Sequence, residues 1–92
     1  MSSAGQKQVS EGVKASVRYR VRSKMEMAVL DLAVGGCMVD ARGWGAKADE
    51  RVQVTLPGLN AITASVAWIE DDRAGLAFEE PLYGPVLERF FD

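Results

Sequence analysis

An alternation of apolar and polar residues beginning at Val13 constrains the fold more than any other feature of the chain. One face of the pattern holds Val13, Ala15, Val17, Tyr19 and Val21, and the other holds Lys14, Ser16, Arg18, Arg20, Arg22 and Lys24. A period of two residues is that of a half-buried β-strand, whose successive side chains point to opposite faces. The stretch therefore predicts a strand with a basic outer face.

The same period returns in shorter stretches that turn signals separate. We expect Ser23 and Lys24 to form a tight turn, and Pro57-Gly58 is a strong turn signal, because proline presets the first corner and glycine accepts a positive φ. The further strands are predicted over residues 25–33, 37–40, 51–56, 61–69 and 75–78.

The pattern changes after Pro81, where Leu82, Val86 and Phe90 are spaced by four residues. This spacing predicts one short amphipathic helix that begins near Pro85 and covers an open end of the sheet. Six short strands and a closing helix predict a mainly β fold, a small six-stranded antiparallel barrel of the split-barrel type. We expect a flexible polar arm over residues 1–12 and one domain over residues 13–92.

Composition excludes several classes of protein. The chain has 92 residues, no histidine and one cysteine, Cys37. It therefore lacks the residues for a Ser-His-Asp or Cys-His site and for an imidazole-held metal, and we expect no enzyme, cofactor or metal centre. The longest uncharged run, residues 52–69, is broken by Pro57 and Gly58, and no signal pattern opens the chain. We therefore expect no membrane insertion and a cytoplasmic location.

Charge is unevenly placed along the chain. Residues 1–47 hold 8 basic and 4 acidic side chains, whereas residues 48–92 hold 3 basic and 9 acidic ones, and the formal net charge is -2. A general nucleic-acid binder needs many cations on one face, so this balance argues against that function. It permits a small anionic ligand beside the basic half.

Two features carry candidate chemistry. Arg18, Arg20 and Arg22 would lie ~6.6 Å apart in steps of two along a strand, and guanidinium groups bind phosphate as a fork or stack on a base. The alternative is a solvated outer face that keeps the barrel soluble.

The second feature is the bend from Asp31 to Gly36, where a carboxylate accepts guanine N–H groups and glycines allow close approach. The alternative is a plain bend between strands.

The two tryptophans and the acidic tip receive simpler interpretations. For Trp68, on an alternating strand, the alternatives are a place in the core or a platform for a ligand, and we favour the core. Trp44, between Gly43 and Gly45, either packs on a hydrophobic edge or meets a partner, and we favour packing. Residues 70–72 are expected to form a solvated hairpin tip rather than a cation site.

The order of these features resembles a PilZ domain from about Val13 to Phe90. The segment from Leu30 to Cys37 is similar to the family's D/N-x-S-x-x-G motif, and residues 64–68 and 74–78 resemble its V-x-W and G-x-x-F strands. The resemblance implies a bacterial receptor for cyclic di-GMP. In that family an R-x-x-x-R segment ahead of the first strand grips the ligand, and the Asp and Ser of the second motif meet a guanine edge.

Transferred residue by residue, the resemblance places cyclic di-GMP at Arg18, Arg20, Arg22, Asp31, Ala33, Gly35 and Gly36. Asp31 and Gly36 match the motif, but Ala33 stands where the family has serine. Arg18 and Arg22 have the spacing of the R-x-x-x-R motif but fall within the predicted first strand. The segment ahead of that strand contains Lys7 and Lys14 instead of arginines.

Two hypotheses follow from this comparison. Either the chain is a cyclic di-GMP receptor that signals to a protein partner, with the arginines lying beside the Asp31 bend, or it is an interaction module that has lost the ligand. In the second case it would hold a protein through the Trp44 loop or the basic face.

Overall fold

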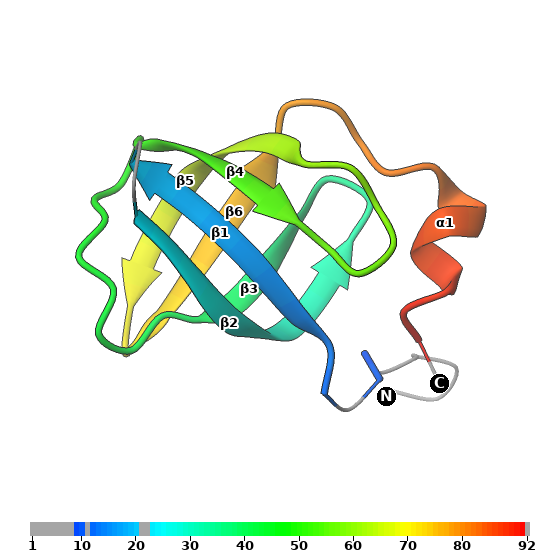
Figure 1. Cartoon of the computed structure of the whole chain (residues 1–92), viewed down its shortest axis with the longest axis horizontal. Helices are drawn as coiled ribbons and strands as arrows, with labels where there is room; N and C mark the ends of the chain where they lie inside the picture. Colours follow the sequence, from blue (N-terminus) through cyan, green and yellow to red (C-terminus); the bar gives the residue numbers. More distant parts are fainter. Residues whose placement is uncertain (1–8, 11, 21–22, 92) are drawn as a thin grey trace, which may run out of the picture.

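Six antiparallel strands close into a barrel, and a short helix lies at one end of it (Figure 1). The computed structural model describes residues 9–10, 12–20 and 23–91. Around the barrel the strand order is β1-β2-β3-β6-β5-β4, and the fold prediction is confirmed. The elements are β1 (Lys14–Arg20), β2 (Ser23–Ala33), β3 (Gly36–Asp40), β4 (Arg51–Thr55), β5 (Ile62–Glu70), β6 (Arg73–Phe78) and α1 (Gly84–Glu88).

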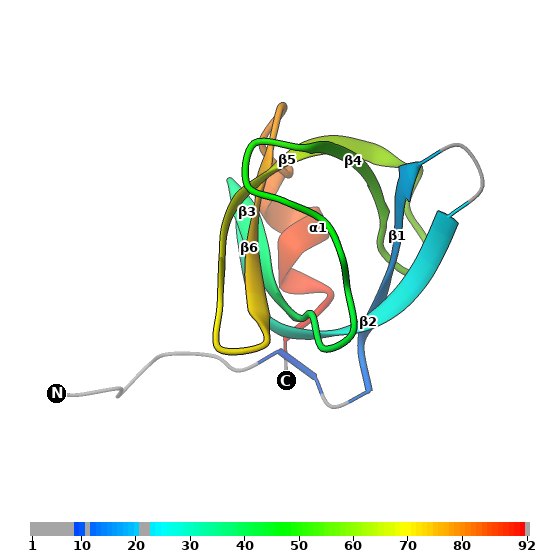
Figure 2. The same cartoon turned by 90° about the vertical axis from the view of Figure 1, so that its left-hand side faces the viewer.

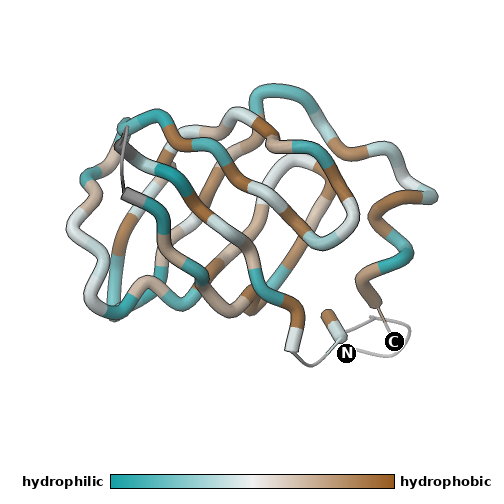
Figure 3. Tube along the Cα trace, in the orientation of Figure 1, coloured by the Kyte–Doolittle hydropathy of each residue, from teal (hydrophilic) through white to brown (hydrophobic). Residues whose placement is uncertain are grey.

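The barrel interior is filled by the apolar members of the alternating pattern, and Figure 3 shows the alternation along the strands. In β1 the side chains of Ala15 and Val17 are fully buried, whereas Arg18 is exposed. The largest fully buried side chains come from four strands and the residue after β4, and they are Leu56, Val17, Val39, Val54 and Val66. Burial of such side chains contributes about 1.5–3 kcal/mol each, so this interior stabilises the closed sheet.

The turn predicted at Ser23 and Lys24 is wrong, because both residues belong to β2. Ser23 pairs with Arg20 and Lys24 pairs with Arg18. The same register sets Met25 opposite the buried Val17, and Met25 packs against the core. A shift of one residue would turn the core-facing side chains of the strand outward, so the burial of Met27 and the packing of Met25 against the core decide where β2 begins. Val21 and Arg22, also assigned to the first strand, lie outside the described residues.

The prediction that Trp68 lies in the core is also wrong. β5 carries a bulge between Val66, which pairs with Leu76, and Trp68, which pairs with Gly75. The extra residue, Ala67, reverses the alternation, because a bulge sets two residues of one strand against one of the other. Trp68 is therefore on the outer surface, 40% exposed.

The two ends of the barrel are covered by different segments. The loop of residues 41–50 crosses one end, which faces the viewer in Figure 2, and its Trp44 is buried. At the other end lies α1, which begins one residue before the predicted Pro85 and is followed by the buried Phe90. The backbone N–H of Ser10 donates to the carbonyl of Phe90 (2.8 Å), so a residue assigned to the arm is bonded to the segment after α1. Among the described residues, none of the helices is long and apolar enough to cross a membrane.

Candidate functional site

The β2–β3 hairpin forms one wall of a surface hollow of about 340 Å³, which we call the Asp31 hollow. Ala33 pairs with Gly36 at the end of the hairpin, and Val34 and Gly35 make the turn. The opposite wall comes from β5 and β6. Predicted site residues that line the hollow are Asp31, Ala33, Gly35 and Gly36.

A β-bulge turns the carboxylate of Asp31 outward. Val29 pairs with Val39 and Asp31 pairs with Met38, so Leu30 is the extra residue on β2. Without the bulge, Asp31 would follow Met27 and Val29 into the core, which would bury an unpaired carboxylate at high cost. With it, Asp31 is exposed, and its Oδ1 accepts the backbone N–H of Leu32 at 3.0 Å. The second carboxylate oxygen has no hydrogen-bond partner among the described residues and is available to a donor from a ligand.

Gly36 is required by the packing of the barrel itself. A Cβ at this position would overlap the backbone carbonyl oxygen of Leu76 on β6, whereas a Cβ at Gly35 would meet nothing within 4 Å. The glycine of the motif therefore has a structural role that does not depend on a ligand. Ala33 is exposed at the edge of the hollow, and its methyl group offers no hydrogen bond.

Trp68 forms part of the wall opposite Asp31, a position that fits the alternative disfavoured from the sequence. Its indole lies over Gly75, and a Cβ at that glycine would overlap the ring. A glycine directly across the ladder from a tryptophan was the available signal, because it leaves room for the ring to lie flat on the neighbouring strand. The Asp31 hollow thus combines a carboxylate, an open hairpin backbone and an aromatic face.

Arg18 lies in a different hollow, of about 580 Å³, which we call the Arg18 hollow. It is lined by residues of β1, β4 and β5, including Tyr19 and Arg51. Arg51 makes an ion pair with Glu79, and the Gln53 side-chain amide donates to the Thr63 hydroxyl at 2.9 Å. This hollow holds two guanidinium groups and one carboxylate.

The structure does not bring Arg18 and Asp31 together. Lys24, the partner of Arg18 on β2, lies seven residues before Asp31, which corresponds to roughly 23 Å at about 3.3 Å per residue. Figure 1 shows the end of β1 at one end of the barrel and the β2–β3 hairpin toward the α1 end. Arg20 ends β1, two residues beyond Arg18, and Arg22 lies outside the described residues.

Two further polar sites lie on β3 and directly after it. Burial raises the pKa of the Cys37 thiol to about 12, so this side chain stays protonated and acts as an apolar core residue. Beyond the end of β3, the Arg42 guanidinium binds the Asp40 carboxylate through Nε and Nη2, the latter at 2.7 Å, and this pairing lowers the pKa of Asp40.

Comparison of the sequence with known proteins finds one matching family. The sequence model of the family described as PilZ domain matches residues 9–88. No curated protein and no solved structure matches the chain.

Proposed function

The chain belongs to the PilZ domain family, whose members are generally cyclic di-GMP receptors, and on that premise we propose that it binds cyclic di-GMP at the Asp31 hollow and passes the second-messenger signal to a protein partner. The binding is non-covalent, and the proposed function includes no reaction. Asp31, the backbone around Gly35 and Trp68 are the groups assigned to the ligand.

One observation carries this proposal: Asp31 and Trp68 line the same hollow from opposite walls. A carboxylate oxygen accepts the N–H groups of a guanine edge, and an exposed indole offers a face on which a base stacks. Stacking of a base on an aromatic side chain contributes about 1–3 kcal/mol. A volume of about 340 Å³ lies at the small end of ligand sites, which suits one guanine rather than the whole dinucleotide.

The phosphates of the ligand must therefore be bound by cationic side chains outside the hollow. β1 begins at Lys14, and the sequence has no arginine before Arg18, so the arginine pair that the family places ahead of this strand is missing. Lys14 is exposed and pairs with Ala28, three residues from Asp31 on β2. A lysine supplies a point charge without the bidentate fork, so we expect weak affinity, with a Kd in the micromolar range.

Titration with cyclic di-GMP tests the proposal. Isotope-labelled protein should show saturable amide shifts over residues 31–37 and 67–77, with a change in Trp68 fluorescence. Asp31→Ala should abolish the response, and Arg18→Ala, in the other hollow, is the matched control that should leave it unchanged. A flat response at high micromolar ligand would reject the proposal, and so would a response lost in Arg18→Ala but kept in Asp31→Ala.

A second candidate is an interaction module that has lost the ligand. It is favoured by Ala33 in the serine position and by the missing arginines. Trp44 is only 8% exposed, so it would not supply the partner surface. The candidate surface in this case is the Arg18 hollow on the basic outer face. The absence of saturable dinucleotide binding, together with partner binding that Arg18→Ala weakens, would favour this candidate.

A further inference from the structure

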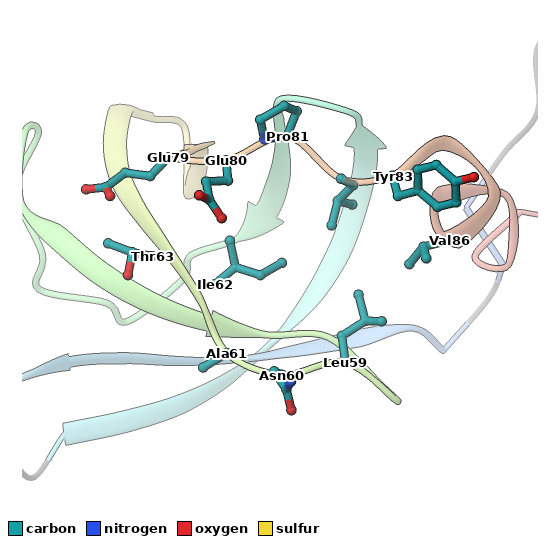
Figure 4. Close-up of a pocket in the computed structure, with 11 residues that line it drawn as sticks. Leu59, Asn60, Ala61, Ile62, Thr63, Glu79, Glu80, Pro81, Tyr83 and Val86 are labelled. Atoms are coloured by element: carbon teal, nitrogen blue, oxygen red, sulfur yellow. The ribbon is translucent and has the colours of Figure 1, made fainter.

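A groove lies between the start of β5, the chain segment 79–83 and the first turn of α1, and we call it the β5–α1 groove (Figure 4). Its volume is about 370 Å³. It is separate from the Asp31 hollow, with which it shares no lining residue. None of the site residues predicted from the sequence lines this groove.

Apolar side chains form the inner surface of the groove. Leu59, Ile62, Leu82 and Val86 are each half-buried, so each packs against the core on one side and remains open on the other. Tyr83, at the α1 end, is 73% exposed. This surface accepts an apolar side chain from outside and would bury it against side chains that the core already holds in place.

Two carboxylates lie at the opposite end of the groove from Tyr83 (Figure 4). Glu79 is paired with Arg51. Glu80 is exposed, and among the described residues it has no ion-pair or hydrogen-bond partner. An occupant that complements this charge carries Lys or Arg, and the excess of acidic residues in the second half of the chain acts in the same direction.

The backbone along the groove favours an extended occupant. The N–H of Glu79 donates to the carbonyl of Thr63 (2.8 Å), and three residues later the N–H of Leu82 donates to Val34 of the β2–β3 hairpin (2.8 Å). The chain therefore leaves β5 between these two bonds. Within the described part of the chain, the backbone groups of Ala61 and Glu80 have no backbone partner. Unpaired strand-edge groups are the sites at which an extended peptide adds by hydrogen bonding.

We propose that the β5–α1 groove docks an extended segment of a protein partner in which apolar residues alternate with Lys or Arg. The apolar side chains enter between Ile62 and Val86, and a cation pairs with Glu80. This inference deepens the proposed adaptor function by naming the partner chemistry, but it does not require that cyclic di-GMP binds.

A labelled peptide of alternating lysine and valine, used without dinucleotide, tests this inference. Fluorescence anisotropy should show saturable binding, and amide shifts should fall on residues 59–63 and 79–86. The matched peptide with glutamate in place of lysine should bind at least tenfold more weakly. A lysine–valine peptide with alternate backbone N-methyl groups should lose binding, because it cannot pair as a strand.

Variants of the protein then test whether Glu80 is the carboxylate that pairs with the peptide lysine. Glu80→Gln should weaken binding of the lysine peptide by roughly fivefold, the effect of one exposed ion pair. Glu26→Gln, an exposed carboxylate on β2 away from the groove, should not change it. Asp31→Ala should also bind the peptide normally, so failure of the dinucleotide site is distinguishable from failure of the groove.

Three results of the peptide experiments would overturn the inference. These are equal affinity for the lysine and glutamate peptides, amide shifts outside the groove, and an unchanged affinity in Glu80→Gln. If sedimentation shows that the protein self-associates and that the lysine peptide dissociates the dimer, the groove belongs to a second copy of this chain, which also contradicts the proposal.

Discussion

The ring of Trp44 meets the ring of Tyr19 edge to face, with the ring centroids 5.6 Å apart and the planes at 86°. This geometry is one that aromatic pairs prefer. It joins the 41–50 loop to β1 and holds the loop across one end of the barrel. The loop tryptophan is therefore a packing residue.

Truncation of Trp44 should destabilise the fold strongly. Trp44→Ala removes a buried aromatic side chain and should lower the free energy of unfolding by about 3–5 kcal/mol. Trp44→Phe should cost far less, because it keeps a ring against Tyr19 and removes the indole N–H, which is buried without a hydrogen-bond partner among the described residues. Urea unfolding of the two variants checks this. Equal losses in both would contradict the packing role.

A methyl group should be tolerated at one glycine of the hairpin and not at the other. Gly36→Ala should lower the free energy of unfolding by roughly 1–3 kcal/mol or more, because its Cβ would overlap the backbone carbonyl of Leu76 and two strands would have to separate. Gly35→Ala, which meets no atom within 4 Å, is the matched control and should unfold at nearly the wild-type urea concentration. Similar midpoints for the two variants would show that β3 and β6 are less closely packed than described.

The strand pattern could be predicted from the sequence because burial inside a barrel imposes a strict period of two. All six predicted strands are present, and their described boundaries differ from the predicted ones by at most two residues. The helix begins within one residue of its predicted start. The turn after the first strand was misplaced. Ser23 is typical of turns, but the burial of Met27 and the packing of Met25 against the core outweigh that local preference and extend β2.

The candidate site was harder to predict because two bulges decide it. The bulge at Leu30 turns Asp31 out of the core, and the bulge at Ala67 turns Trp68 out beside the same hollow. A bulge shifts the phase of the alternation by one residue and leaves little trace in composition. The arginines of the basic outer face could be predicted from the sequence. The sequence did not show that the length of β2 sets Arg18 and Asp31 apart.

The β5–β6 turn should gain stability from residues that accept a left-handed backbone. Asp71 and Asp72 have φ angles of 52° and 63°, between the paired residues Glu70 and Arg73. A two-residue hairpin turn with positive φ at both positions prefers Asn-Gly. The double variant Asp71→Asn/Asp72→Gly should therefore raise the free energy of unfolding by about 0.5–1 kcal/mol, measured by urea denaturation. Asp72→Val should lower it, and a gain in that variant would contradict the turn geometry.

Alkaline pH should destabilise the protein through Cys37. Burial raises the pKa of this thiol from 9.0 to about 12, so the unfolded chain releases the proton near pH 9 while the folded chain keeps it. The stabilising effect is complete below pH 9 and decreases as the pH rises from 9 toward 12. At pH 10 the loss is about 1.4 kcal/mol, the value of one pH unit. Urea unfolding at pH 8 and pH 10 should show a smaller loss in Cys37→Ala. Equal losses would exclude this thiol as the cause.

A hydroxyl restored at position 33 should strengthen dinucleotide binding without affecting the fold. Ala33 is exposed at the edge of the Asp31 hollow, where the PilZ motif has serine, so Ala33→Ser buries no new polar group. One hydrogen bond contributes roughly 0.5–1.5 kcal/mol, which corresponds to an increase of up to about tenfold in affinity for cyclic di-GMP. Calorimetric titration of the wild type and the variant measures the change, and Ala48→Ser, an exposed position in the 41–50 loop outside the hollow, is the matched control. A gain in both variants, or in neither, would contradict the placement of the guanine edge beside Asp31. Binding seen only in Ala33→Ser would show that the missing hydroxyl separates this chain from a working receptor.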